Sequence, residues 1–182
     1  MSDREWKTVW KADIEVDLKM QALEPPTEII QGGQQHKMFR FISANNRDGA
    51  VVIVEKDDQI ALVSHTRVAV GKISLELPQG MGDVEDSDGI ETGMREAREE
   101  LGVRVKDGIS LGSIHADTAV LGNKINVILC TYDGELGFND GEVLAVHWTN
   151  KCDLVELVKL NKIEDGISIS AIMKYLIYKN DL

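Results

Sequence analysis

Cysteine, basic charge and long apolar runs are all scarce in this 182-residue chain. Its two cysteines, Cys130 and Cys152, form neither a CxxC pair nor a Cys/His ligand spacing, which argues against a zinc site and against a disulfide framework. No apolar run approaches the ~20 residues that a membrane-spanning helix needs, and the first residues lack the apolar core of a signal peptide. We therefore expect reduced thiols, a cytoplasmic location and no membrane partner.

Basic residues are outnumbered, with 20 Lys and Arg against 31 Asp and Glu, which gives a formal net charge of −11. This balance argues against a protein that binds the nucleic-acid backbone, because such proteins normally carry a basic face. The 43% of hydrophobic and 28% of charged residues are otherwise typical of a globular protein. The length suits one domain, or one domain with an appendage, that folds without a metal or disulfide.

The N-terminal part of the chain differs from the rest in its turn and breaker signals. Asp13 to Leu18 alternates polar and apolar residues like a short strand, and Lys37 to Ile42 can form a second strand. We therefore expect residues 1–47 to be a small β-rich section, and residues 48–182 to be the main domain.

After residue 48 the apolar pattern predicts strands and helices in a mixed order. Ala50 to Val54 is wholly apolar, as a central strand is. This order favours an α/β (α+β) fold with a mixed β-sheet core sandwiched between helices. The other expected elements are strands at Ile60–Ser64, Ile73–Leu77, Ile109–Ile114, Ile125–Tyr132 and Val143–Trp148, and a helix from about Asp88 to Leu101.

Two further helices are expected to close the chain. The first starts near Asp153, with Glu156 three residues later as a capping-box pair. The second runs from about Ser168. The residues that its helical spacing predicts to be buried are Ile169, Ile172, Met173 and Leu176.

The most acidic segment runs from residue 83 to residue 100, with eight acidic and two basic residues, so more than half of the net charge of −11 lies there. On a helix, Glu96 and Glu100 are i,i+4 neighbours and Glu96 and Glu99 are i,i+3 neighbours, so three glutamates share one face. A separate stripe is expected to face the core, and it consists of Ile90, Met94, Ala97 and Leu101.

Carboxylates at this spacing repel one another, and in the C-terminal half of a helix the dipole also disfavours them. Mg²⁺ or Mn²⁺ would offset this repulsion, because carboxylate oxygens are the ligands that these hard cations prefer. The alternative is a solvated charged face with internal ion pairs to Arg95 and Arg98.

Residues Arg95 to Val103, which read REAREELGV, match the second half of the Nudix box, REUxEExGU with U aliphatic. The sequence therefore resembles the Nudix hydrolases. The first half of the box departs from the pattern, because fourteen residues separate Gly80 from Arg95, one more than in the family. We infer a one-residue insertion in this loop. The acids that can replace the first glutamate of the box are Glu85, Asp86 and Asp88.

The resemblance implies a Mg²⁺- or Mn²⁺-dependent hydrolase of a nucleoside diphosphate linked to another group. Arg95 would orient the glutamates by salt bridges, and Gly102 would end the helix. Glu99, Glu100 and Arg95 are accordingly expected to be catalytic. The implied metal ligands are Glu96, Glu99, Glu100 and a backbone carbonyl of Gln79 or Gly80.

The residues before the box resemble a particular group, the ADP-ribose pyrophosphatases and related nucleoside-diphosphate-sugar hydrolases. Arg67 to Gly71 and Leu75 to Gly80 carry this resemblance. It implies that Arg67 and Glu76 bind substrate. It also implies that the N-terminal β-rich section builds a homodimer and contributes to the substrate site.

In the same family a loop glutamate acts as general base or as an extra metal ligand. Alignment assigns this role to Glu142, with Glu135 and Asp140 as alternatives. The four histidines, in contrast, show no pair or triad spacing, so each is expected to be structural.

The resemblance favours ADP-ribose as the substrate, cleaved to a nucleoside monophosphate and a sugar phosphate. Where many ADP-ribose enzymes carry a proline after the box, this chain has Asp117 and Thr118. GDP-mannose, ADP-glucose or another nucleoside-diphosphate sugar therefore stays open as the substrate. A dinucleoside polyphosphate is a further alternative, against which the N-terminal section and the long match to the ADP-ribose group argue. A catalytically silent nucleotide sensor is the alternative from another class, and the three clustered glutamates argue against it.

Overall fold

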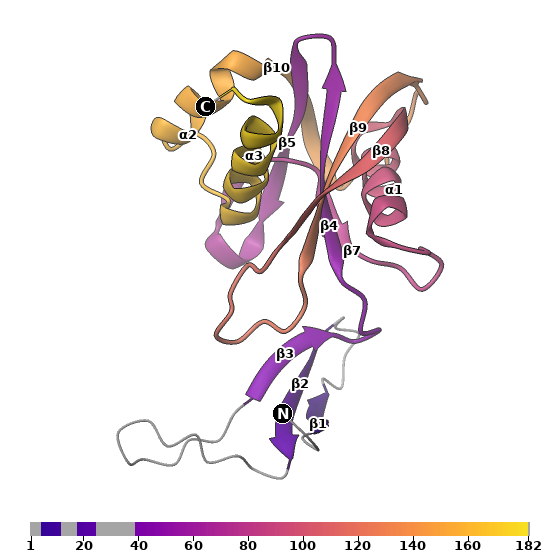
Figure 1. The fold of residues 1–182 in the computed structure, drawn as a ribbon, viewed down its shortest axis with the longest axis vertical. Coiled ribbons are helices and arrows are strands. Elements are labelled where there is room, and N and C mark those ends of the chain that lie inside the picture. Colours follow the sequence, from indigo (N-terminus) through magenta and orange to yellow (C-terminus); the bar gives the residue numbers. More distant parts are fainter. Residues whose placement is uncertain (1–4, 12–17, 25–38, 182) are drawn as a thin grey trace. The chain divides into compact units, whose positions relative to one another are not determined.

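The computed structural model describes residues 5–11, 18–24 and 39–181 (Figure 1). The chain forms two compact units, one of residues 1–47 with 115–123 and one of residues 48–114 with 124–182. The sequence analysis did not anticipate that the segment His115–Asn123 groups with the N-terminal residues.

The first unit contains a three-stranded antiparallel sheet in the order β1-β2-β3. The strand expected at Asp13–Leu18 falls outside the described residues except at Leu18, where β2 begins. Phe41 of β3 exchanges backbone hydrogen bonds with the later segment, at Val120 and Gly122. The bounds are β1 (Glu5–Lys11), β2 (Leu18–Glu24) and β3 (Phe39–Ser43).

The second unit is built on a seven-stranded mixed sheet in the order β10-β5-β4-β9-β8, with β6 beside β5 and β7 beside β4. Strands β4 and β9 run parallel, whereas the other pairs of this sheet are antiparallel. The strands are β4 (Gly49–Lys56), β5 (Gln59–Arg67), β6 (Lys72–Glu76), β7 (Gln79–Met81), β8 (Val103–Ile114), β9 (Ile125–Glu135) and β10 (Val143–Asn150).

Helices cover both faces of this sheet, as Figure 1 shows. Because successive side chains of a strand point to opposite faces, Val51 and Ile53 of β4 pack in one core with α3 (Gly166–Lys179), while Val52 packs in the other with α1 (Gly89–Leu101). A short helix, α2 (Leu154–Lys159), joins α3 on its face. The predicted fold class, a mixed β-sheet core sandwiched between helices, is confirmed.

Helix α1 begins and ends as its sequence predicts. The Asp88 side chain accepts hydrogen bonds from the backbone N–H groups of Ile90 and Glu91, both at 2.9 Å. Gly102 ends the helix at a φ of +66°, where its N–H donates to the carbonyl of Arg98. The expected apolar stripe of Ile90, Met94, Ala97 and Leu101 packs against the sheet.

The C-terminal helices differ from their predictions at two places. The capping box at Asp153 is wrong, because the 3₁₀ turn Lys151–Asp153 leads straight into α2 and leaves Asp153 in a helical conformation without a capping hydrogen bond. In α3 the buried stripe is turned toward Ala171 and Tyr175, so Met173 is 49% exposed rather than buried. Among the described residues, the helices are too short or too polar to cross a membrane.

Candidate active site

Arg95 is the centre of an ion-pair cluster in α1. Its Nη1 lies 2.6 Å from Glu99 Oε2 and 2.9 Å from Glu96 Oε1, and its Nη2 lies 3.1 Å from Asp86 Oδ2. Nη2 also donates to the backbone carbonyl of Met81. Burial alone would lower the pKa of Arg95, but the hydrogen bond to Asp86 and the charges of the two glutamates raise it. The guanidinium therefore holds the glutamates in place as a permanent cation.

Of the three loop acids, the structure brings Asp86 to Arg95. Asp86 is 5% exposed and also accepts the backbone N–H of Asp83. Burial opposes its ionisation, yet the hydrogen bonds from Arg95 and Asp83 lower its pKa. Asp88 caps the helix, and Glu85 is exposed to solvent.

Glu96 and Glu100 are buried carboxylates, 6% and 3% exposed. Burial raises the pKa of Glu96 to about 7, against the lowering effect of Arg95. Burial, together with the charge of Glu96, raises the pKa of Glu100 to about 8. Within the described residues Glu100 Oε2 has no hydrogen-bond partner. Two adjacent buried carboxylates, one with an unsatisfied oxygen, fit the oxygen donor set of a divalent cation.

Strand β7 brings the backbone that precedes the Nudix-box loop against these glutamates. It pairs with β4, with Gly49 opposite Met81. The backbone N–H of Gln79 donates to Glu100, and a Cβ atom on Gly80 would collide with the carboxylate of Glu96. Glycine is therefore required for the backbone and Glu96 to approach so closely. The carbonyl ligand at Gln79 or Gly80 stays a prediction.

Arg67 and Glu76 form a second ion pair beside this site. Arg67 Nε lies 3.0 Å from both carboxylate oxygens of Glu76, which is 2% exposed. Gln79 Nε2 donates to Glu76 and to Asp165, and Asp165 also caps α3 through Ser168. A cavity of about 290 Å³ opens next to Gln79 and Gly80. Its lining residues are Ala50, Arg67, Gln79, Gly80, Met81, Ile125, Asp165 and Ile167.

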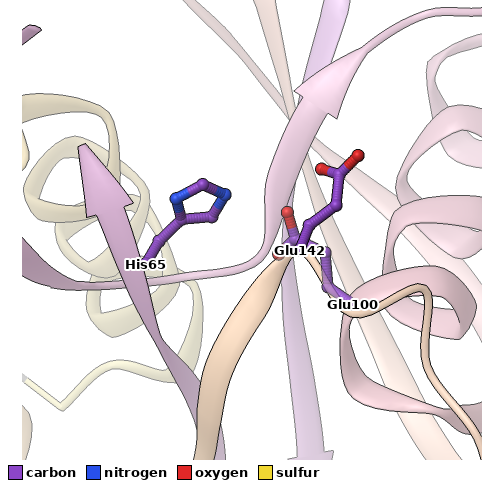
Figure 2. A group of neighbouring side chains, drawn as sticks. All are labelled: His65, Glu100 and Glu142. Carbon is purple, nitrogen blue, oxygen red and sulfur yellow. The ribbon is translucent and has the colours of Figure 1, made fainter. Parts of the chain in front are cut away.

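The three candidates for the general base or extra metal ligand, in the region before β10, lie in different surroundings. Glu142 is exposed, and one of its carboxylate oxygens lies within 4.8 Å of a carboxylate oxygen of Glu100 (Figure 2). The side chain of Asp140 accepts the backbone N–H of Glu142 at 2.9 Å. Glu135 instead accepts the hydroxyl hydrogen of Tyr132, at the end of β9.

His65 lies beside Glu142 and Glu100, a proximity that the sequence analysis did not anticipate. One of its ring nitrogens falls within the same 4.8 Å. The proximity of His65 to Glu142 follows from the register of β5 and β10, in which His65 is opposite Val143. A single sequence does not show this register, because the two strands are far apart along the chain.

A family model of the NUDIX domain matches residues 45–168, which include all of these site residues. The chain belongs to the Nudix family.

The relatives share this family or fold at modest identity. Nudix hydrolase 14, chloroplastic, from Arabidopsis thaliana is 40% identical over 58 residues, which is 31% of this chain and 19% of that protein. The chain thus spans about a fifth of the length of that relative.

Two solved structures share the fold. A crystal structure of an ADP compounds hydrolase superposes with a TM-score of 0.76 at 17% identity, over 98% of this chain and 95% of that chain. A NUDIX hydrolase from Nitrosomonas europaea gives a TM-score of 0.57 at 20% identity, over 73% of this chain and 90% of that chain.

Proposed function

We propose that this Nudix hydrolase cleaves the pyrophosphate bond of a nucleoside diphosphate joined to a sugar, and that ADP-ribose is its preferred substrate. The products are a nucleoside monophosphate and a sugar phosphate. The observation that carries the proposal is the buried pair Glu96 and Glu100, of which Glu96 is paired with Arg95 and Glu100 has one unsatisfied carboxylate oxygen. One structural relative is an ADP compounds hydrolase, which agrees with a substrate that contains ADP.

The glutamates of α1 would hold Mg²⁺ or Mn²⁺. Glu96, Glu99 and Glu100 supply carboxylate oxygens, and Arg95 fixes the first two. When bound, such a cation neutralises charge on the diphosphate and lowers the pKa of water. Asp86 takes the place of the first glutamate of the box, because it contacts Nε and Nη2 of Arg95 while Glu96 and Glu99 contact Nη1.

The substrate residues act from the cavity next to Gly80. Arg67 lines this cavity and would contact the diphosphate through its guanidinium. Glu76 is buried, so it acts as the counter-ion that fixes Arg67 rather than through exposed contact with a sugar. Glu142 is an exposed carboxylate that lies beside Glu100 in this arrangement, where it would act as the general base or as an extra metal ligand.

A substrate panel tests the proposal. The full chain is incubated with MgCl₂ and ADP-ribose, ADP-glucose, GDP-mannose, NADH or Ap4A, and release of AMP or GMP is measured by chromatography. We expect the fastest release from ADP-ribose, its loss with EDTA, and its loss in Glu100→Gln. Tight nucleotide binding without turnover of any compound would contradict the proposal and favour a sensor. Faster turnover of GDP-mannose or ADP-glucose would identify that nucleotide sugar, rather than ADP-ribose, as the preferred substrate.

The small N-terminal unit is proposed to make a homodimer, as its resemblance to the ADP-ribose group suggests. Size-exclusion chromatography with light scattering tests this proposal. A monomeric mass at micromolar concentration would overturn it. The cytoplasmic location likewise stays a prediction, which fractionation of the source cells can check.

A further inference from the structure

His65, Glu100 and Glu142 converge from three elements of the second unit (Figure 2). His65 lies in β5, Glu100 lies in the last turn of α1, and Glu142 immediately precedes β10. Because β10 pairs with β5 and places Val143 opposite His65, the residue before Val143 is held near the imidazole. One potential ligand atom of each side chain lies within 4.8 Å of the other two.

The His65 ring is oriented by the backbone. Its Nδ1 lies 3.1 Å from the carbonyl oxygen of Thr66. Since a carbonyl can only accept a hydrogen bond, Nδ1 is the donor in this contact, and in the tautomer that this contact favours Nε2 has the free lone pair. In Figure 2 this second nitrogen is on the side of the two glutamates. A histidine that ligates a metal is commonly fixed in this way, with the other ring nitrogen donating to a carbonyl.

Glu100 gives an independent indication of a ligand at this place. Its side chain is 3% exposed, and Oε2 is without a hydrogen-bond partner in the described part of the chain. A buried carboxylate oxygen that has no donor costs free energy, and a cation offsets this cost. As metal ligands, two carboxylates and one imidazole would bring two negative charges, which a divalent cation balances.

We propose that His65, Glu100 and Glu142 form a binding position for a divalent transition-metal cation, with His65 as a nitrogen ligand that makes this position prefer Mn²⁺ to Mg²⁺. The preference follows because imidazole nitrogen is a good ligand for transition metals, whereas Mg²⁺ strongly favours oxygen. The position rests on the proposed function in one respect, since Glu100 would serve both this cation and the one near Glu96.

Electron paramagnetic resonance of the Mn²⁺-loaded full-length protein tests the nitrogen ligand directly. We expect a ¹⁴N coupling of imidazole to Mn²⁺ in the natural chain and its loss in His65→Gln. The matched control is His147→Ala, which removes an exposed histidine of β10 that is hydrogen-bonded to Ser64. This control should keep the coupling.

Affinity measurements complete the test. Titration followed by calorimetry should show Mn²⁺ binding weakened about tenfold in His65→Gln, the effect of losing about one modest ligand. Mg²⁺ binding should change by less than about twofold, because it does not depend on the nitrogen. Equal losses for the two cations, or an unchanged Mn²⁺ affinity, would overturn the proposal.

The outcomes separate this proposal from the proposed function. Hydrolysis of ADP-ribose by a Mn²⁺-loaded chain without ¹⁴N coupling would overturn the role of His65 and leave the function standing. Coupling without hydrolysis of any nucleotide sugar would leave the metal position standing and overturn the function. Absence of Mn²⁺ binding at millimolar concentration would overturn the metal position, and hydrolysis measured with MgCl₂ would then decide the function separately.

Discussion

Replacement of Glu100 by glutamine should stabilise the metal-free protein at neutral and alkaline pH. Glu100 is 3% exposed, and its pKa is about 8 in the fold against an ordinary 4.5. The folded chain therefore binds this proton more tightly than the unfolded chain does. The free energy of unfolding that depends on Glu100 is highest below about pH 4.5 and decreases as the pH rises through about 8.

The size of the effect follows from the same values. At pH 7 the ionisable carboxyl costs the fold roughly 3 kcal/mol, because each tenfold change in proton binding is worth about 1.4 kcal/mol. The amide group that the substitution introduces at this position needs a partner of its own, which costs about 1–2 kcal/mol. The net gain is about 1–2 kcal/mol, or about 2–8 °C in Tm for a chain of this length.

Thermal unfolding at pH 5 and pH 8, with and without MgCl₂, measures this effect. Glu100→Gln should gain stability at pH 8 and lose that advantage at pH 5, where the natural carboxyl is already protonated. The matched control is Glu85→Gln, which removes the same charge from an exposed loop position and should change Tm little. A variant less stable than the natural chain at pH 8 would refute the reasoning, because the carboxylate would then be paired within the fold.

Three further results are expected. Gly80→Ala should reduce kcat by about 100-fold with little loss of Tm, because the added methyl group displaces the Glu96 carboxylate; unchanged kinetics would show that this approach is unimportant. Arg67→Lys should raise KM for ADP-ribose about tenfold and leave kcat nearly unchanged, since lysine cannot bind Glu76 and the diphosphate in the same forked geometry. A decrease in kcat with an unchanged KM would contradict a binding role. MgCl₂ should raise Tm more at pH 8 than at pH 6, because below pH 7 protons compete for carboxyls whose pKa values are about 7 and 8; equal shifts in differential scanning calorimetry would argue against these ligands.

Local periodicity was sufficient for the elements whose contacts are local. The apolar stripe of α1 and its glycine end were predictable, because a helix relates residues three and four apart. The acid that pairs with Arg95 was not predictable in this way. Glu85, Asp86 and Asp88 are chemically similar, and the conformation of the loop before α1 determines that Asp86 contacts Arg95.

Other features depended on packing between distant segments. Met173 and Tyr175 of α3 are both largely apolar, and the rotation of the helix against the sheet decides which one is buried. His65 comes close to Glu100 and Glu142 only through the register of β5 and β10. The segment His115–Asn123 joined the first unit through backbone hydrogen bonds to Phe41 that no side-chain pattern indicates.

Hydrogen bonds at the start of α3 tie this helix to the backbone beside the candidate active site. Ser168 Oγ accepts the backbone N–H of Leu77, and Asp165 accepts a hydrogen bond from the side chain of Gln79, so two links join the helix to the chain on either side of Pro78. Local unfolding of α3 would release this stretch, although every residue of the Nudix box would remain. A ligand in the cavity beside Gly80 should therefore protect the amides of α3 from hydrogen exchange. The exchange rate of this helix would then indicate whether the cavity is occupied, although α3 supplies no proposed metal ligand.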